Sequence, residues 1–247
     1  MPKVTLIEFT GKGRQDETRH AANLLAFTKA TRLDLTAGLF ERIQGMTDAE
    51  LDDQLDYMSK TIRSSWEFVD VTFLVENVTR ACAQQMTRTR TASFAMQSLR
   101  VVDATELPVA NPFTPADLFF DSYEETVAKT MQGYQDLMAM GSAPQDARGL
   151  LPLNTETNLI VKYNLRSFVD LVTARKSHRT QSEYRDIVLA MEAAVLRVWP
   201  WSEPFFVDSN DSAIKILEGV IDELGLEVGG GPGWDVAKAI DLIRGTK

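Results

Sequence analysis

The chain has 247 residues, of which 44% are hydrophobic and 25% charged, values typical of a globular protein with one core. Its net charge of −9 argues against broad binding to a nucleic acid polymer, because no surplus of cations displaces the counterions. No apolar run approaches the ~20 residues of a membrane span and no leader is evident, so we expect a cytoplasmic protein that does not enter a membrane. With one cysteine, Cys82, and two histidines, an internal disulfide is impossible and we predict no metal site.

The first quarter of the chain is mainly helical in pattern. Val4 to Phe9 alternates with a period of two and predicts a strand. Asp16 to Arg32 predicts a helix and Leu35 to Ile43 a short one. The next helix begins at Thr47, because Thr47 and Glu50 form a capping box.

Two strands and a long helix follow. Glu67 to Glu76 is rich in β-branched and aromatic residues and predicts a strand, and Val78 to Thr87 predicts a short helix. Proline after Thr114 favours a helix start, and apolar residues keep a spacing of three and four as far as Met138. Asn158 to Tyr163 predicts another strand.

Helices dominate the last third. We predict helices over Leu165 to Arg175, Gln181 to Trp199, Ala213 to Leu224 and Val236 to Arg244. A glycine-rich run, 229–233, lacks the Lys-Ser/Thr ending of a phosphate loop and is interpreted as a turn. The pattern is α+β, with residues 1–247 forming a single domain.

Four arginines stand out between residues 80 and 100 of this acidic chain: Arg80, Arg88, Arg90 and Arg100. In an extended segment, Arg88 and Arg90 would share a face and could contact one phosphate-bearing ligand, since guanidinium groups bind phosphate in bidentate fashion. The alternative is that these arginines form surface ion pairs with some of the 35 acidic residues.

A longer pattern includes these arginines. Arg88-Thr89-Arg90, seven residues and Ser98 resemble the Arg-His-Arg, seven residues, Ser signature of flavin-dependent thymidylate synthases. Further segments are similar to motifs of that family in the same order: Ser64–Phe73, Thr79–Ala81, Ala92–Phe94, Gln97–Arg100, Ala147–Pro152, Asn164–Ser167 and Gln181–Arg185. The chain departs from the family pattern where Thr89 replaces the signature histidine and Phe68 a histidine of the strand.

The resemblance implies a fold, an activity and an assembly. It implies a central, mostly antiparallel sheet flanked by helices, in a homotetramer that binds FAD and nucleotide where subunits meet. It also implies C5-methylation of a pyrimidine nucleoside monophosphate, of the type that converts dUMP to dTMP. Methylenetetrahydrofolate would be the carbon donor and NADPH the reductant of the flavin.

Site residues follow from the same resemblance, position by position. Arg148 would hold the nucleotide phosphate, and Arg175 would be catalytic, stabilising negative charge that develops at N3 and its neighbouring carbonyl oxygen. The implied nucleotide site comprises Gln85, Arg88, Gln97, Ser98, Arg100, Arg148 and Arg175. The implied FAD site comprises Ser64, Arg88, Thr89, Arg90, Asn164, Arg166 and Asp170. Ser98 is interpreted as a hydrogen-bonding group rather than a nucleophile, because no histidine base lies beside it in sequence.

Three alternatives remain open from the sequence. The substrate could be UMP, as in nucleoside-antibiotic biosynthesis, or dCMP. The chain could be a non-catalytic relative that binds nucleotide or flavin. It could also be an unrelated helical interaction protein with surface arginine pairs.

Overall fold

The computed structural model describes residues 2–34, 36–177 and 179–207. The chain divides into two compact units, Met1–Ser202 and Glu203–Lys247. The first unit contains all the strands and α-helices described.

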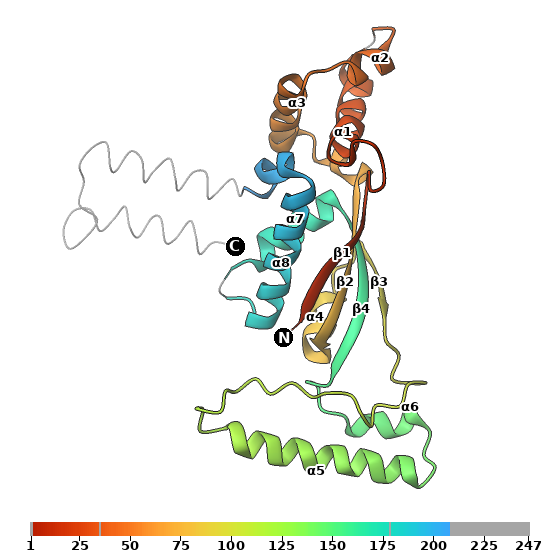
Figure 1. The fold of residues 1–247 in the computed structure, drawn as a ribbon, viewed down its shortest axis with the longest axis vertical. Helices are drawn as coiled ribbons and strands as arrows, with labels where there is room; N and C mark the ends of the chain where they lie inside the picture. Colours follow the sequence, from red (N-terminus) through yellow and green to blue (C-terminus); the bar gives the residue numbers. More distant parts are fainter. Residues whose placement is uncertain (1, 35, 178, 208–247) are drawn as a thin grey trace, which may run out of the picture. The chain divides into compact units, whose positions relative to one another are not determined.

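The elements of the described residues follow one another along the chain (Figure 1). They are β1 (Lys3–Phe9), α1 (Glu17–Leu33), α2 (Leu39–Gln44), α3 (Asp48–Thr61), η1 (Arg63–Phe68), β2 (Asp70–Thr79), α4 (Arg80–Met86), β3 (Ala92–Met96), α5 (Phe120–Ala139), α6 (Pro144–Ala147), η2 (Arg148–Leu150), β4 (Glu156–Asn164), α7 (Leu165–Arg175), α8 (Ser182–Val198) and η3 (Pro200–Phe206).

The four strands form one antiparallel sheet in the order β1-β2-β4-β3. Alternating residues of the two central strands are buried, among them Phe73, Val161 and Tyr163. The opposite face carries Ile160, which is 41% exposed, and Lys162. One face of the sheet is therefore core, whereas the other, the open sheet face, stays largely accessible in this part of the chain.

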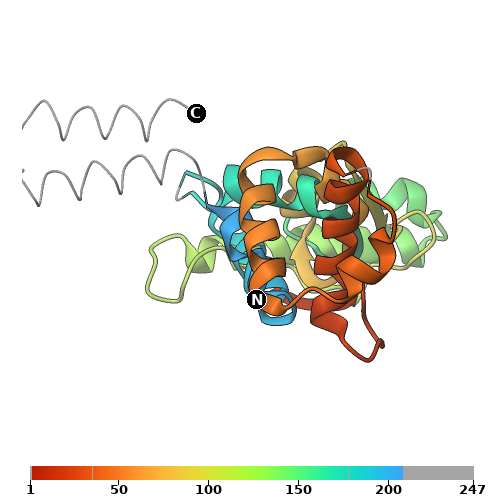
Figure 2. The same cartoon turned by 90° about the horizontal axis from the view of Figure 1, so that it is seen from above.

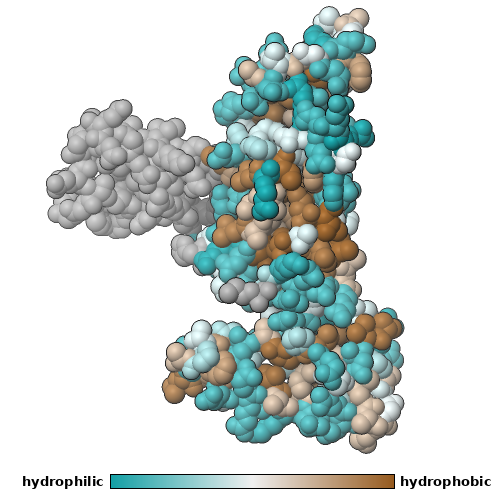
Figure 3. Space-filling view, viewed as in Figure 1, coloured by the Kyte–Doolittle hydropathy of each residue, from teal (hydrophilic) through white to brown (hydrophobic). Residues whose placement is uncertain are grey.

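Helices α7 and α8 lie against the core face (Figures 1 and 2). Phe168 of α7 packs on Phe73 and Tyr163, with ring centroids 5.4 and 5.9 Å apart. Trp199, at the end of α8, meets Phe9 of β1 edge to face at 6.0 Å. Apolar surface also gathers in the middle of the side that carries these helices (Figure 3).

Helices α1 to α3 pack together at one end of the sheet, and α5 and α6 lie at the other (Figure 1). The α5 end has a small core of its own, built on Leu99, Ala104, Tyr134 and Ala147. The buried Tyr134 hydroxyl accepts a hydrogen bond from the Ala104 backbone N–H at 3.0 Å. This contact fixes the loop after β3, because an unpaired buried N–H is costly.

Most predicted elements are confirmed as to type, and so are the α+β class and the antiparallel sheet. Three local predictions are wrong. Strand β3 was not anticipated; the long helix begins at Phe120 rather than Thr114; and α2 begins at Leu39 rather than Leu35. At Thr114, the Asp117 carboxylate accepts from both the backbone N–H and the hydroxyl, which closes a turn instead of starting a helix.

The predictions for the C-terminal region lie outside the described residues. These are the helices over Ala213–Leu224 and Val236–Arg244 and the glycine turn at 229–233. A single domain over 1–247 stays a prediction for the same reason. Among the helices that the structure describes, none has the length and apolar character to cross a bilayer.

Cys82 is buried on α4, and burial, with the charge of Glu183 adding to it, raises the pKa of its thiol to about 12. At pH 8 only about one thiol in 10⁴ is then ionised, and the thiolate is the reactive form. We expect iodoacetamide to leave Cys82 unmodified in the native protein and to alkylate it fully in guanidinium chloride, as measured by intact mass. Rapid alkylation of the native protein would contradict this placement.

Candidate functional site

Arg80 is held half-buried where β2 passes into α4. Its backbone N–H donates to the Thr155 carbonyl at 3.0 Å, so β2 and the start of β4 fix its position. One terminal nitrogen, Nη2, donates to the Gln97 carbonyl at 2.7 Å and to Thr157 Oγ1 at 3.3 Å. The Nε–H is buried and has no partner among the described residues.

A second guanidinium, that of Arg148 on η2, lies near enough to Arg80 for its charge to act there. Burial lowers the pKa of Arg80, and the charge of Arg148 on η2 lowers it further. Arg148 is exposed and donates from Nε to the Gln145 carbonyl at 3.2 Å. Within the described ranges, no carboxylate forms an ion pair with either arginine. Two neighbouring cations, neither paired with an acid of the described residues, form a candidate site for an anion, and phosphate suits the guanidinium fork.

The end of β3 brings further predicted residues to this place. Gln97 accepts from Arg80 through its carbonyl, and its side-chain oxygen accepts from Thr157 at 3.5 Å. Ser98 follows directly, and its hydroxyl accepts from the Arg100 backbone N–H at 3.4 Å. Gln97 and Arg148 are therefore brought to one cluster around Arg80, the phosphate-facing cluster. The Arg100 side chain is exposed in the turn beyond it.

Arg175 belongs to a different cluster, at the last residue of α7. Its guanidinium lies over the Tyr184 ring of α8, 5.5 Å from the centroid. Burial raises the pKa of the Tyr184 phenol. Thr89 and Arg175 lie close enough to lower that pKa in part. Neither side chain forms a hydrogen bond with the buried hydroxyl. Thr89 stands in the turn between α4 and β3.

Gln85 and Arg88 take different positions around that turn. The Gln85 side chain donates from Nε2 to Oε1 of Gln181 at the start of α8. The Arg88 side chain is exposed just after α4. The extended segment begins only at Ala92, so the expectation that Arg88 and Arg90 share a strand face is wrong.

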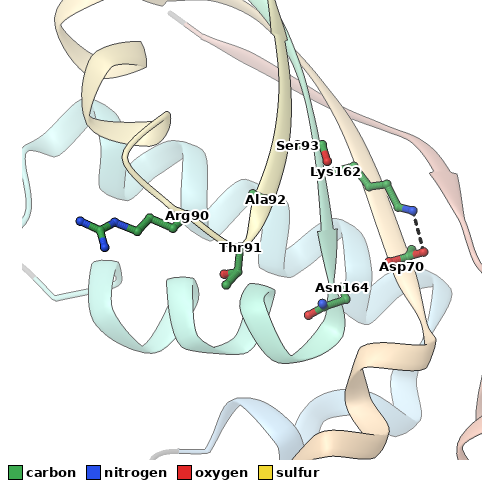
Figure 4. A pocket seen from close by; sticks show the side chains of 7 residues that line it. All are labelled: Asp70, Arg90, Thr91, Ala92, Ser93, Lys162 and Asn164. Carbon is green, nitrogen blue, oxygen red and sulfur yellow. Dashed lines mark ion pairs between the residues drawn. The ribbon is translucent and has the colours of Figure 1, made fainter.

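Arg90 and Asn164 line a cavity of about 330 Å³ at one end of the open sheet face (Figure 4). Arg90 extends from the α4–β3 turn on one side, and Lys162 pairs with Asp70 at 2.8 Å on the other. The Asn164 Oδ1 accepts from the Ser167 backbone N–H at 2.9 Å and so caps α7. The remaining lining residues are Thr91, Ala92 and Ser93.

The junction of η1 with α7 carries three further predicted flavin residues, Ser64, Arg166 and Asp170. Arg166 pairs with Glu67 at 2.6 Å, and Asp170 pairs with Arg63. The Ser64 hydroxyl accepts from Arg32 at 2.7 Å. The predicted flavin residues thus lie in the cavity of Arg90 and Asn164 and at the junction of η1 with α7. Arg88 and Thr89 lie in the turn between α4 and β3. At the η1 junction, a phosphate would have to compete with Glu67 for Arg166.

A flavin dinucleotide fits these residues in part. Arg90 is exposed and forms no ion pair within the described ranges, so its charge is available to a phosphate. The cavity volume lies at the low end of the ~300–1,000 Å³ typical of ligand pockets, which suits one nucleotide-sized portion of FAD. No group of three metal-ligating side chains lies together in the described part of the chain.

Arg80 and Tyr184 are the residues that sequence reasoning missed. Arg80 was noted as one of four arginines, and its position directly after a buried strand was the available signal. Tyr184 lies within the segment Gln181–Arg185 that resembles a family motif, and the sequence alone assigns it no role. Spacing does not reveal these contacts, because Thr157 lies 77 residues from Arg80 and because Arg175 and Tyr184 belong to different helices.

The geometry favours a protein that binds a phosphorylated ligand, and comparison with known proteins gives the family. The model of the family described as "Thymidylate synthase complementing protein" matches residues 6–201. The chain therefore belongs to this family, which the signature around Arg88 indicated.

Curated relatives are flavin-dependent thymidylate synthases. That of Synechocystis is 35% identical over 153 residues, covering 56% of this chain and 71% of the relative. That of Thermococcus onnurineus is 29% identical over 197 residues, 76% of each chain. The match to the Halobacterium salinarum protein, 31% identical over 150 residues, covers 49% of this chain and spans 61% of that relative's length. The match to the Haloarcula marismortui protein likewise spans less than two thirds of it, 62%.

A solved structure shares the fold. It is the crystal structure of a UMP/dUMP methylase, PolB from Streptomyces cacaoi, bound with 5-Br dUMP. The TM-score is 0.63 with 22% sequence identity, covering 83% of this chain and 94% of that one. The likeness supports the fold that the family signature implied.

We expect Arg80→Met to weaken binding of a pyrimidine nucleoside monophosphate about 10- to 100-fold, because a charged hydrogen bond contributes roughly 1.5–3 kcal/mol. Binding of the corresponding nucleoside should not change, since it has no phosphate. Isothermal titration calorimetry measures both. Arg197→Met, at an exposed arginine of α8, serves as the matched control. Equal loss of nucleotide and nucleoside affinity would contradict a phosphate contact.

Proposed function

We propose that this chain is a flavin-dependent enzyme that methylates C5 of a pyrimidine nucleoside monophosphate. The carbon donor is methylenetetrahydrofolate, and NADPH reduces the bound FAD. Membership of the thymidylate synthase complementing family supports this class of reaction. The observation that carries the proposal is the phosphate-facing cluster, where the charge of Arg148 acts on the half-buried Arg80 and neither arginine pairs with a carboxylate of the described residues.

The nucleotide phosphate binds between these two guanidinium groups. A phosphate dianion there removes the repulsion between the two cations and gives the buried Arg80 Nε–H an acceptor. Gln97 and Ser98, at the end of β3, donate and accept hydrogen bonds beside it. Gln85, Arg88 and Arg100 complete the proposed nucleotide site.

Arg175 acts on the pyrimidine ring. Carbon C5 becomes a nucleophile when negative charge collects at N3 and the neighbouring carbonyl oxygen, and a fixed guanidinium stabilises that charge. Burial keeps the nearby Tyr184 phenol neutral by raising its pKa, so it does not cancel the charge of Arg175. Removing a group of this kind commonly costs roughly 3–4 kcal/mol of transition-state stabilisation.

The flavin supplies the redox chemistry when bound, while the chain provides position and charge. Arg90 and Asn164 would hold one portion of FAD in the cavity of Figure 4. The FAD would also be held at the junction of η1 with α7, by Ser64, Arg166 and Asp170. Arg88 and Thr89 would contact it from the α4–β3 turn.

We propose a cytoplasmic homotetramer. The cavity is small for a dinucleotide, so a second copy of the chain would supply the rest of the FAD surface. Ile160 on the open sheet face and Leu189 on α8 are 41% and 42% exposed, which suits coverage by other subunits. A mass near four chains by light scattering is the expected result, and a monomer that retains FAD would contradict it.

UMP is the alternative substrate with a specific observation behind it. The structural neighbour PolB is called a UMP/dUMP methylase, and dUMP and UMP differ by one ribose hydroxyl. dCMP remains a further candidate on the same fold.

The deciding experiment incubates the purified chain with methylenetetrahydrofolate, NADPH and each of dUMP, UMP and dCMP. We expect a yellow protein that absorbs near about 450 nm, as flavins do, and a 5-methylated product from dUMP or UMP by chromatography and mass spectrometry. Arg175→Ala should keep the fold and FAD but lower kcat roughly 10²- to 10³-fold.

Two results would contradict the proposal. One is a protein that binds nucleotide and FAD yet forms no product from any of the three, as expected of a non-catalytic relative. The other is a colourless protein without affinity for nucleotides, as expected of an interaction protein.

A further inference from the structure

Tyr184 is fully buried in the first turn of α8, yet its hydroxyl has no hydrogen-bond partner among the described residues. Buried tyrosine hydroxyls usually find a partner. The ring contacts a functional group instead: the Arg175 guanidinium lies 5.5 Å from its centroid. A buried aromatic ring under an exposed arginine is a geometry in which the ring orders the cation.

We infer that Tyr184 is a positioning residue, whose ring holds the Arg175 guanidinium toward the pyrimidine without neutralising its charge. This inference rests on the proposed function. Arg175 is the final residue of α7, and no carboxylate pairs with it in the described part of the chain. A long side chain of this kind would otherwise sample many rotamers. A carboxylate could restrain it equally well, but would cancel the charge that the reaction needs.

The first turn of α8 is itself fixed at two points by α4. Glu183 accepts from the Thr79 backbone N–H at 2.7 Å and from the Thr79 hydroxyl at 2.6 Å, just before α4. Gln181 accepts from Gln85 near the end of α4. Because hydrogen bonds hold Gln181 and Glu183, just before Tyr184 in the chain, its ring is a rigid support rather than a mobile one.

Thr89 connects this support to the signature turn. It lies close enough to Tyr184 to influence the phenol, as Arg175 does. Thr89 occupies the position where the family signature has histidine, and its short side chain leaves the phenol room beside the turn. Tyr184 thus contacts both Arg175 and the α4–β3 turn, and a purely structural core residue would need neither contact.

The test compares Tyr184 with Trp199, which is also fully buried and whose ring N–H has no partner among the described residues, but which packs on Phe9 at the other end of α8. Tyr184→Leu removes the ring and should lower kcat roughly two- to fivefold, the scale of a cation–π contact with an exposed arginine, with little change in the nucleotide KM. Tyr184→Phe keeps the ring and should restore most of the turnover. Trp199→Leu should also lower thermal stability but leave kcat unchanged.

A double-mutant cycle separates positioning from stability. If Tyr184 acts through Arg175, adding Tyr184→Leu to Arg175→Ala should lower kcat no further. A full additional loss in that background would overturn the inference. So would a Tyr184→Leu enzyme with the kcat of Trp199→Leu.

Failure of the proposed function would look different. In that case the unmodified chain itself gives no product from dUMP, UMP or dCMP, and the role of Tyr184 in turnover falls with it. Turnover in the unmodified chain together with an unaffected Tyr184→Leu variant would overturn the inference about Tyr184 alone.

Discussion

The proposed site depends on the repulsion between two guanidinium groups that the fold holds together. Arg80 is fixed by the carbonyl of Gln97 and the hydroxyl of Thr157, so it cannot swing away from Arg148. Burial of the Arg80 Nε–H adds a desolvation cost that no described protein group offsets. An arrangement that is unfavourable in the free protein becomes favourable once a phosphate enters, and this difference is the physical source of the proposed affinity.

The architecture around this cluster explains why distant segments cooperate. Strands β2, β3 and β4 are neighbours in the sheet, and their ends carry Arg80, Gln97 and Thr157 to one place. Helix α8 receives hydrogen bonds from both ends of α4 and carries Tyr184 beneath Arg175. A helix of seven residues, α4, therefore links the phosphate-facing cluster to the proposed catalytic arginine.

The sequence was informative where local chemistry decides the outcome. The capping box at Thr47 and the apolar periods of β2, β4, α7 and α8 each specify a local structure, and these predictions are confirmed. The family signature around Arg88 also indicated the family correctly. The predicted roles of the individual site residues stay predictions.

The sequence was misleading where tertiary contacts decide. Strand β3, Ala92–Met96, is short and lies at the sheet edge. It forms by pairing with β4, which follows much later in the chain, as Ala92 opposite Tyr163 illustrates. Thr114 and proline looked like a helix start, but Asp117 closes a turn there. The Arg175–Tyr184 contact depends on how α7 packs against α8, which periodicity within either helix does not specify.

A crystal structure of the chain with dUMP bound tests the central claim most directly. The account predicts that phosphate oxygens lie within hydrogen-bonding distance of both Arg80 and Arg148, with the pyrimidine carbonyl turned toward Arg175. A nucleotide bound with its phosphate elsewhere, and with Arg80 and Arg148 paired to carboxylates of the assembled protein, would contradict it.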